Sequence, residues 1–393
     1  MTLHDTKATL LKAGIGSAIG VGGILAIAAL FLIGVAIKNI FFPPRTEPPT
    51  VAFGPLPALE FPKNAVDGAF TYILKTVSGD LPGDLPDRLS VFPILQKPPD
   101  FLNLDKVKKI AGNLGFTTSQ GTVLPETQLG NSYYEWDEQQ NFNRRIVFNI
   151  NTYDFKMTSD YLQSLTAAGG GYITQETDAI KTAQEFLGAA GLAPTDININ
   201  KTNSSDNSLR FITYPQLFSI ATSPQGTNTL VPTTKLANTQ VIRVDLYQSD
   251  LKYDLITGKS EGFFNSNKQT IPVTIPVIYP NPPYSIMSFW ITSGQGGATV
   301  SQAFYTHKDI NLADTTATYP VKTPVVAFGE LQKGNAYIAS YGGTDNNIQI
   351  QNIFLAYYLG EEPQAYAMPV YVFEGNNAFY AYISAITDSQ IQK

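Results

Sequence analysis

The sequence contains no cysteine and has only two histidines among its 393 residues. The absence of cysteine excludes disulfide bonds, thiolate nucleophiles and cysteine-ligated zinc. Two histidines are too few for an ordinary zinc hydrolase, which uses several nitrogen or sulfur ligands. We therefore predict neither a metal nor a cofactor.

Charge is also scarce, because Asp, Glu, Lys and Arg make up 15% of the chain against roughly 25% in an average soluble protein. Neutral polar residues take their place, as in "NINTYDF" and "TDNNIQIQN", and this composition favours an exported protein. The net charge is −6, and Lys and Arg are scattered along the chain. Binding to a phosphate backbone needs a basic stripe, so we predict no nucleic-acid partner.

The uncharged run 13–37 predicts a transmembrane helix. As a helix it would extend about 37 Å, enough to cross a hydrocarbon core of roughly 30 Å. A cleaved signal peptide would have a shorter apolar stretch followed by small residues at a cleavage site. The positive-inside count is a tie, with two basic residues near each end of the run. The exported composition therefore decides the orientation: a short cytoplasmic tail over 1–12, and the bulk of the chain outside a bacterial cell membrane.

Small residues recur at helical spacing within this run. Gly16 and Gly20 form a GxxxG pair, and Ala18, Gly22 and Ala26 form a parallel row. Such rows allow two membrane helices to approach closely, which predicts a homodimer through this face. The alternative is that glycine is simply common in membrane helices.

Residues 38–62 are rich in proline and predict a stalk that leaves the membrane. Its first part would be a semi-rigid, polyproline-like spacer. Apolar residues then return, although a free linker does not need them. We predict that these residues dock against the first folded unit; they are Val51, Phe53, Leu56, Leu59 and Phe61.

Three well-separated segments have the apolar periodicity of amphipathic helices, and β-rich sequence follows each of them. The first would begin with a cap at Asn103, the second would end at Gly191, and the third would have Thr323 as its cap and Pro324 in its first turn. The predicted fold class is therefore α+β, with an N-terminal transmembrane helix followed by repeated units of one helix packed on an antiparallel β-meander. The predicted units span 63–175, 176–322 and 323–393.

The last of these segments, "FGELQKGNAYI" through "AFYAYISAI", carries a family resemblance between residues 328 and 386. It resembles the extracytoplasmic domains of YycH/YycI-type regulatory proteins and the broader PepSY-like modules. The positions that correspond to the family pattern are Leu355, Tyr357, Pro369, Tyr371, Phe373, Tyr382 and Ala385. Tyr371 departs from the pattern, since that family often has tryptophan there. The resemblance implies one membrane helix, an α+β unit outside it, and regulation by contact with a protein partner.

Several short motifs resemble catalytic signatures but lack the required spacing. Residues 307–309 read His-Lys-Asp, whereas the phospholipase signature places its Lys two positions after the His. Ser249 and Lys252 match Ser-x-x-Lys, but residues three apart on a strand face opposite sides. Glu361 and Glu362 are adjacent and precede a proline, which favours a solvated turn. We therefore predict no catalytic, cofactor-binding or metal-binding residues.

These observations favour a single-pass membrane-anchored, extracytoplasmic binding or regulatory adaptor protein that is not an enzyme. Two alternatives stay open. One is an envelope enzyme that processes glycan or peptide through carboxylates. The other is a cell-surface structural subunit that assembles through sheet edges and the GxxxG face.

Overall fold

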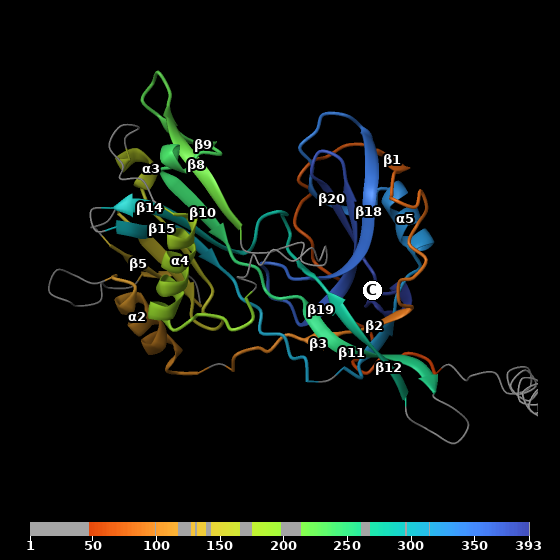
Figure 1. The fold of residues 1–393 in the computed structure, drawn as a ribbon. Coiled ribbons are helices and arrows are strands. Elements are labelled where there is room, and N and C mark those ends of the chain that lie inside the picture. Colours follow the sequence, from red (N-terminus) through yellow and green to blue (C-terminus); the bar gives the residue numbers. More distant parts are fainter. Residues whose placement is uncertain are drawn as a thin grey trace, which may run out of the picture. The chain divides into compact units, whose positions relative to one another are not determined.

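The structure is a computed structural model in which the described residues are 47–98, 100–116, 127–129, 132–138, 143–165, 175–197, 214–260, 268–294, 297–313 and 315–392. The chain divides into two compact units, Met1–Pro49 with Ile256–Ile271 and Thr50–Leu255 with Pro272–Lys393. In the first unit, the amide of Glu47 donates to the carbonyl oxygen of Gly258 at 2.8 Å. The second unit contains the two large sheets (Figure 1).

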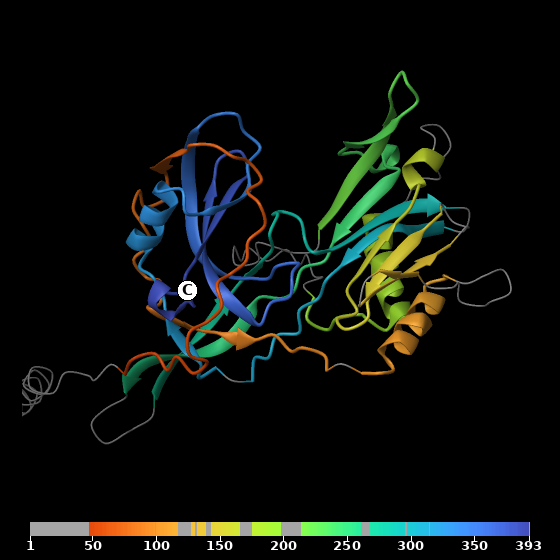
Figure 2. The ribbon, with the colours of Figure 1, turned by 180° about the vertical axis from the view of Figure 1, so that it is seen from behind.

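The larger sheet has nine strands and is antiparallel throughout. Its strands in spatial order are β4 (Thr127–Leu129), β5 (Tyr133–Asp137), β6 (Arg145–Asn149), β7 (Phe155–Thr158), β15 (Gly297–Tyr305), β14 (Met287–Gly294), β10 (Val241–Asp245), β8 (Tyr214–Thr222) and β9 (Asn228–Pro232). Helix α4 (Glu176–Ala190) packs against β15, β10 and β14, and α2 (Asn103–Asn113) packs against α4. Figures 1 and 2 show α4 on one side of this sheet and bare strands on the other.

Period-2 alternation explains why one face carries the helices and the other stays open. In β7, Phe155 and Met157 are buried while Lys156 between them is exposed. In β14, Phe289 and Ile291 are fully buried while Trp290 between them is only half-buried. Successive side chains of a strand point to opposite faces, so the apolar set meets α4 and the polar set faces away.

The second sheet has seven strands, of which five form a continuous path. The path is β1 (Thr71–Leu74), β18 (Asn347–Tyr358), β19 (Tyr366–Gly375), β20 (Phe379–Ser384) and β17 (Tyr337–Ser340), with β13 (Val277–Ile278) on β18 and β3 (Phe92–Pro93) on β19. Helix α5 (Pro324–Gln332) packs near β20. Smaller elements are the β2–β16 pair (Arg88–Ser90, Thr318–Pro320), the β11–β12 pair (Leu251–Ser260, Lys268–Ile275), α3 (Tyr161–Ser164) and two 3₁₀ turns (Leu236–Asn238, Asp388–Gln390).

The predicted fold class is wrong. The described residues contain twenty strands and four α-helices, and they do not form repeats of one helix on its own meander. Strands β4–β7 come from the segment predicted as the first unit, yet they share one sheet with β8–β10, β14 and β15 from the segment predicted as the second. In addition, β1 and β13 pair in parallel with β18, although no parallel pairing was expected. Local periodicity detects a helix or a strand, but pairing between distant strands has no local signal.

The predicted membrane segment 13–37 lies outside the described residues, and so do Gly16, Ala18, Gly20, Gly22 and Ala26. Among the described residues, none of the helices has the length and apolar character needed to cross a membrane.

The apolar part of the predicted stalk, residues 51–61, is called the strap here. Leu56 is fully buried, and it forms a parallel bridge with Ile391 near the C-terminus. Its amide donates to the Gln390 carbonyl oxygen and its own carbonyl accepts from the Gln392 amide, both at 2.8 Å. The remaining predicted docking residues are partly buried and pack against hydrophobic cores of the larger compact unit (Thr50–Leu255 with Pro272–Lys393). They are Val51, Phe53, Leu59 and Phe61.

The residues that carry the family resemblance all lie in the seven-stranded sheet or directly after it. All seven are buried. Tyr371 donates its hydroxyl to the Lys322 carbonyl oxygen at 2.7 Å, and Tyr382 donates to the Tyr279 carbonyl oxygen at 3.0 Å. Their positions are those of core residues, and none of them lines the pocket described next.

Candidate functional site

A pocket of about 740 Å³ opens on the helix-free face of the nine-stranded sheet. This volume lies within the range of about 300–1,000 Å³ that small-molecule sites occupy. Its floor comes from β5, β6, β7, β10, β14 and β15, and its walls come from the segments 94–97, 152–154, 280–286, 306–309 and 361–364. All of these segments belong to the second compact unit.

The floor carries an arginine that is fixed on several sides. The guanidinium carbon of Arg243 lies 4.0 Å from the ring centroid of Tyr284 and 4.7 Å from that of Trp290. Its Nη2 donates to Asp245 Oδ1 at 2.9 Å. Burial raises the pKa of the Asp245 carboxyl, and the charge of Arg243 opposes that rise. The same carboxylate oxygen accepts the amide of Ser285 at 3.0 Å, so Asp245 holds both the arginine and this part of the wall.

A second cation lies on the same face. Lys156 Nζ sits 5.2 Å from the ring centroid of Phe304, and Phe304 packs edge-on against Trp290 with centroids 5.4 Å apart. Phe304 pairs across the strands with both Lys156 and Ser288. Lys156 forms no ion pair within the described part of the chain. The floor is thus an aromatic surface with two cations on it, which we call the cationic floor (Lys156, Arg243, Trp290 and Phe304).

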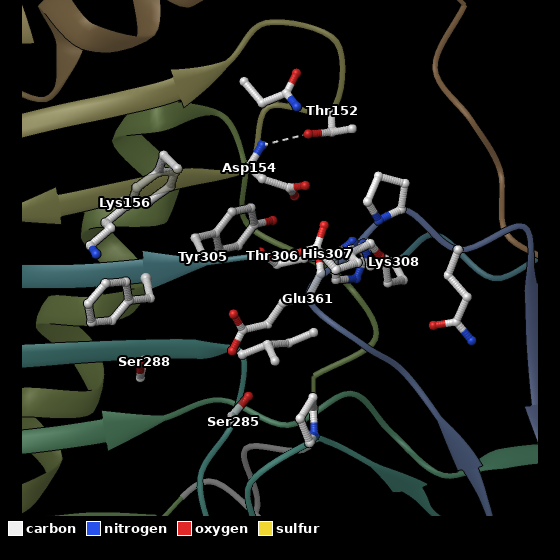
Figure 3. A pocket seen from close by; sticks show the side chains of 18 of the residues that line it. Thr152, Asp154, Lys156, Ser285, Ser288, Tyr305, Thr306, His307, Lys308 and Glu361 are labelled. Carbon is white, nitrogen blue, oxygen red and sulfur yellow. Dashed lines mark hydrogen bonds between the residues drawn. The ribbon is translucent and has the colours of Figure 1, made fainter. Parts of the chain in front are cut away.

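The opposite end of the pocket is acidic. Figure 3 shows Asp154, Tyr305, His307, Lys308 and Glu361 grouped where the strands end, with Lys156 and Ser288 farther along the sheet. The carboxylates that line this end are Asp154, Asp309, Glu361 and Glu362, and we call them the acidic end. Asp154 precedes β7, while Glu361 and Glu362 follow β18, so two distant chain segments supply them.

Asp154 is half-buried, and its amide donates to Thr152 Oγ1 at 3.3 Å (Figure 3). Burial raises the pKa of its carboxyl. Hydrogen bonds from Thr152 and the His307 backbone and the charge of Lys308 oppose this rise without cancelling it. Asp154 is therefore a carboxyl group whose charged form is poorly solvated and would gain from an added cationic partner.

Lys308 is only 7% exposed. Its Nζ donates to the carbonyl oxygens of Glu361 and Glu362 at 3.4 and 3.1 Å. Burial lowers the pKa of this amine, and the nearby carboxylates of Asp154, Glu362 and Glu361 oppose the fall. The lysine thus ties the loop after β18 to the segment after β15, and its ammonium is held by protein oxygens.

His307 lies between two carboxylates. Its Nε2 is 2.7 Å from Asp196 Oδ1, and its Nδ1 is 3.2 Å from Asp309 Oδ1. Burial would raise the pKa of the Asp196 carboxyl, but hydrogen bonds and charge from His307 and a bond from Gln248 lower it overall. Both ring nitrogens have partners, so the imidazole fixes the strand end and does not offer a free base. The described residues also contain no group of three or more His, Asp or Glu side chains placed to hold a metal ion.

The pocket brings together residues for which the sequence predicted no chemistry. Residues 307–309, read as a false phospholipase signature, and Glu361 and Glu362, read as a solvated turn, all line it. No motif in the sequence points to Asp154, Lys156 or Arg243. The available signal was a charged residue between buried apolar neighbours in a strand, as at Lys156 and Arg243. That pattern marks the open face but does not reveal which other strands lie beside it.

No family model and no curated protein sequence matches this chain, and the resemblance to YycH/YycI-type proteins therefore stays a prediction. Among solved structures, the chain is similar to an uncharacterized protein from Eubacterium rectale ATCC 33656. The two are 13% identical, the match covers 76% of this chain and 85% of that one, and the TM-score is 0.36.

Proposed function

We propose that this chain is a binding protein of the bacterial cell envelope that takes a small polar ligand, or the end of a larger polar chain, in this pocket. The segment 13–37 would hold it at the membrane, as its composition predicts. Binding would be the signal that a regulatory adaptor passes to a protein partner. The function rests on recognition and not on turnover.

The observation that carries this proposal is the fixed arrangement of Arg243. Two aromatic rings and a buried carboxylate hold its guanidinium before any ligand arrives. Rigid groups lose little conformational freedom on binding, so such preorganisation favours affinity. A pocket of this volume, with aromatic walls and a few fixed polar groups, has the usual features of a small-ligand site.

The test is a binding screen on the full-length chain in lipid nanodiscs. Calorimetric titration would compare short peptides, oligosaccharides and dicarboxylic acids, with Trp290→Ala as the pocket variant and Lys333→Gln as the control. Lys333 is exposed and does not line the pocket. We expect at least one class to bind saturably, the Trp290→Ala variant to weaken it at least about tenfold, and Lys333→Gln to leave it unchanged. Absence of saturable binding in every class would overturn the proposal.

A second candidate is an enzyme that processes peptide or glycan. Asp154 and Lys308 favour it, because burial shifts the pKa of the acid upward and that of the amine downward in one pocket, and such groups are candidates for acid–base chemistry. Incubating the chain with each ligand found in the screen and following product by mass spectrometry separates the two functions. Turnover that disappears in Asp154→Asn would favour the enzyme. An unchanged ligand would favour binding.

A further inference from the structure

The separation of charge within the pocket identifies a class of ligand. Resting on the proposed function, we infer that the ligand is a short zwitterionic peptide whose carboxylate binds the cationic floor and whose ammonium binds the acidic end.

The cationic floor has unused capacity for an anion. Arg243 donates from Nη2 to Asp245, and its Nε is sealed from solvent. The side chain keeps 15% exposure and lines the pocket, so a ligand carboxylate would contact the part of the guanidinium that stays exposed. Lys156 lies on the same face without an ion pair in the described part of the chain, and Trp290 and Phe304 pack against each other between the two cations. A carboxylate accepts charge-assisted hydrogen bonds from both guanidinium and ammonium groups, so it suits this pair of cations.

The acidic end has the complementary capacity for a cation. Four carboxylates line it together with two lysines. The Lys308 ammonium donates to two backbone carbonyls while its charge also acts on Asp154, and Lys97 Nζ donates to the Thr152 carbonyl oxygen at 3.2 Å. The carboxylates still outnumber these cations by two. Asp309 already contacts His307. Asp154, Glu361 and Glu362 remain, and Asp154 is the most enclosed of the three. A primary ammonium placed among them would gain attraction from several negative charges in a partly desolvated site.

The spacing of the two ends fits a peptide of a few residues. Asp154 directly precedes β7 and is two positions from Lys156, which is about 7 Å at roughly 3.4 Å per residue of extended chain. Lys156, Phe304 and Ser288 lie side by side on three neighbouring strands. Trp290, which pairs with Arg243, lies two positions farther along β14 than Ser288. The ends of the pocket are therefore about 7–14 Å apart. An extended peptide covers that distance with two to four residues at about 3.5 Å each.

The experiment uses trialanine with free ends, N-acetyl-trialanine and trialanine amide, titrated calorimetrically into the full-length chain in nanodiscs. We expect each cap to raise the Kd at least about tenfold, because each removes one charged contact. Lys156→Gln and Arg243→Gln should each reduce the sensitivity to the C-terminal amide and keep the sensitivity to N-acetylation. Glu361→Gln and Asp154→Asn should do the reverse, and Lys333→Gln should keep both sensitivities.

The outcomes separate this inference from the proposed function. If a ligand of another class binds the pocket while the free and capped peptides bind equally or not at all, the zwitterion inference is overturned and the binding function stands. If no class binds, the proposed function has failed as well. If variants at the two ends lose both sensitivities together, the assignment of each charge to its own end is wrong. Lys156 and Glu361 are surface positions, so their variants test the assignment even if Arg243→Gln does not fold.

Discussion

The two sheets of the second unit bury their strands differently. In β19, every residue from Ala367 to Phe373 is buried, so both faces of the strand are covered, because neighbouring residues point to opposite faces. In β7 of the nine-stranded sheet, buried and exposed residues alternate. Strand β19 is therefore covered on both faces, whereas β7 leaves one face open, and that open face lines the pocket. The proposed binding site thus lies on the sheet that leaves one face of its strands open.

The same contrast appears in the use of aromatic residues. In the seven-stranded sheet, buried tyrosines donate to backbone oxygens, as Tyr357 does to Ser90 at 2.6 Å and Tyr382 to Tyr279 at 3.0 Å. On the open sheet face, Trp290 and Phe304 pack against cationic side chains. Buried hydroxyls that are satisfied by the backbone fix a core, while aromatic faces at a pocket can contact a ligand.

The difference between the two sheets is tested most directly by removing one phenylalanine side chain from each and comparing the loss of stability. Phe373→Ala removes a fully buried ring and should lower the free energy of unfolding by about 3–5 kcal/mol. Phe304→Ala removes a half-buried ring from the open face and should cost only about 1–2 kcal/mol. Urea unfolding of the full-length chain, followed by circular dichroism, measures both. Equal losses would show that the open face is as much a part of the core as β19.

The strap provides the next largest effect, since it helps to cover the seven-stranded sheet. Phe53 packs on Tyr366 with centroids 5.0 Å apart, and Phe61 packs on Tyr337 at 5.2 Å. Replacing both Phe53 and Phe61 with Ser should destabilise the protein by about 2–3 kcal/mol, because two aromatic contacts and their apolar burial are lost. The urea midpoint should fall accordingly. An unchanged midpoint would mean that the segment only tethers the folded unit.

Local structure was largely readable from the sequence. The three predicted helices correspond to α2, α4 and α5; Gly191 ends α4 with φ +68°, and Thr323 Oγ1 accepts the Val326 amide at 3.4 Å. The cap predicted at Asn103 is wrong: Asn103 is the first residue of the helix, and its side chain accepts the Tyr153 hydroxyl at 3.0 Å. These signals lie within a few residues of each other, which is why single-sequence reasoning finds them.

The sheet order and the site were not readable for the same physical reason. Strand β7 pairs with β15, placing Phe155 beside Tyr305 across a long stretch of sequence. Only this pairing brings Lys156 next to Phe304, and only the loop after β18 brings Glu361 to the pocket. No residue near Lys156 or Glu361 in the sequence indicates the partner, so the pocket residues looked like isolated surface charges.

A buried hydroxyl network gives a smaller test of the closed core. Tyr357 and Tyr253 share a hydrogen bond of 2.7 Å between their hydroxyls, and Tyr357 also donates to the Ser90 carbonyl oxygen. Tyr357→Phe leaves both partners buried without it and should cost about 1–2 kcal/mol. The matched control is Tyr133→Phe in β5, where the side chain is exposed and the change should stay within about 0.5 kcal/mol. A negligible effect at both positions would mean that the hydroxyls do not fix the core.

The smallest expected effects are those of pH on folding stability, which have opposite signs for Asp154 and Asp196. The folded-state pKa of Asp154 is raised above its ordinary value of 3.8, mainly by burial, so the folded state binds more protons there and stability falls as the pH rises through that window. The folded-state pKa of Asp196 is lowered, because His307 outweighs burial. The ionised Asp196 carboxylate therefore contributes to folding stability above pH 3.8, and this contribution is lost as the pH falls through the folded-state pKa. Asp154→Asn should therefore gain stability relative to the wild type between about pH 4 and about pH 7, while Asp196→Asn should lose it between about pH 3 and about pH 7. Urea midpoints of both variants at these pH values measure the differences, and two shifts of the same sign would show that burial and not His307 governs both carboxyls.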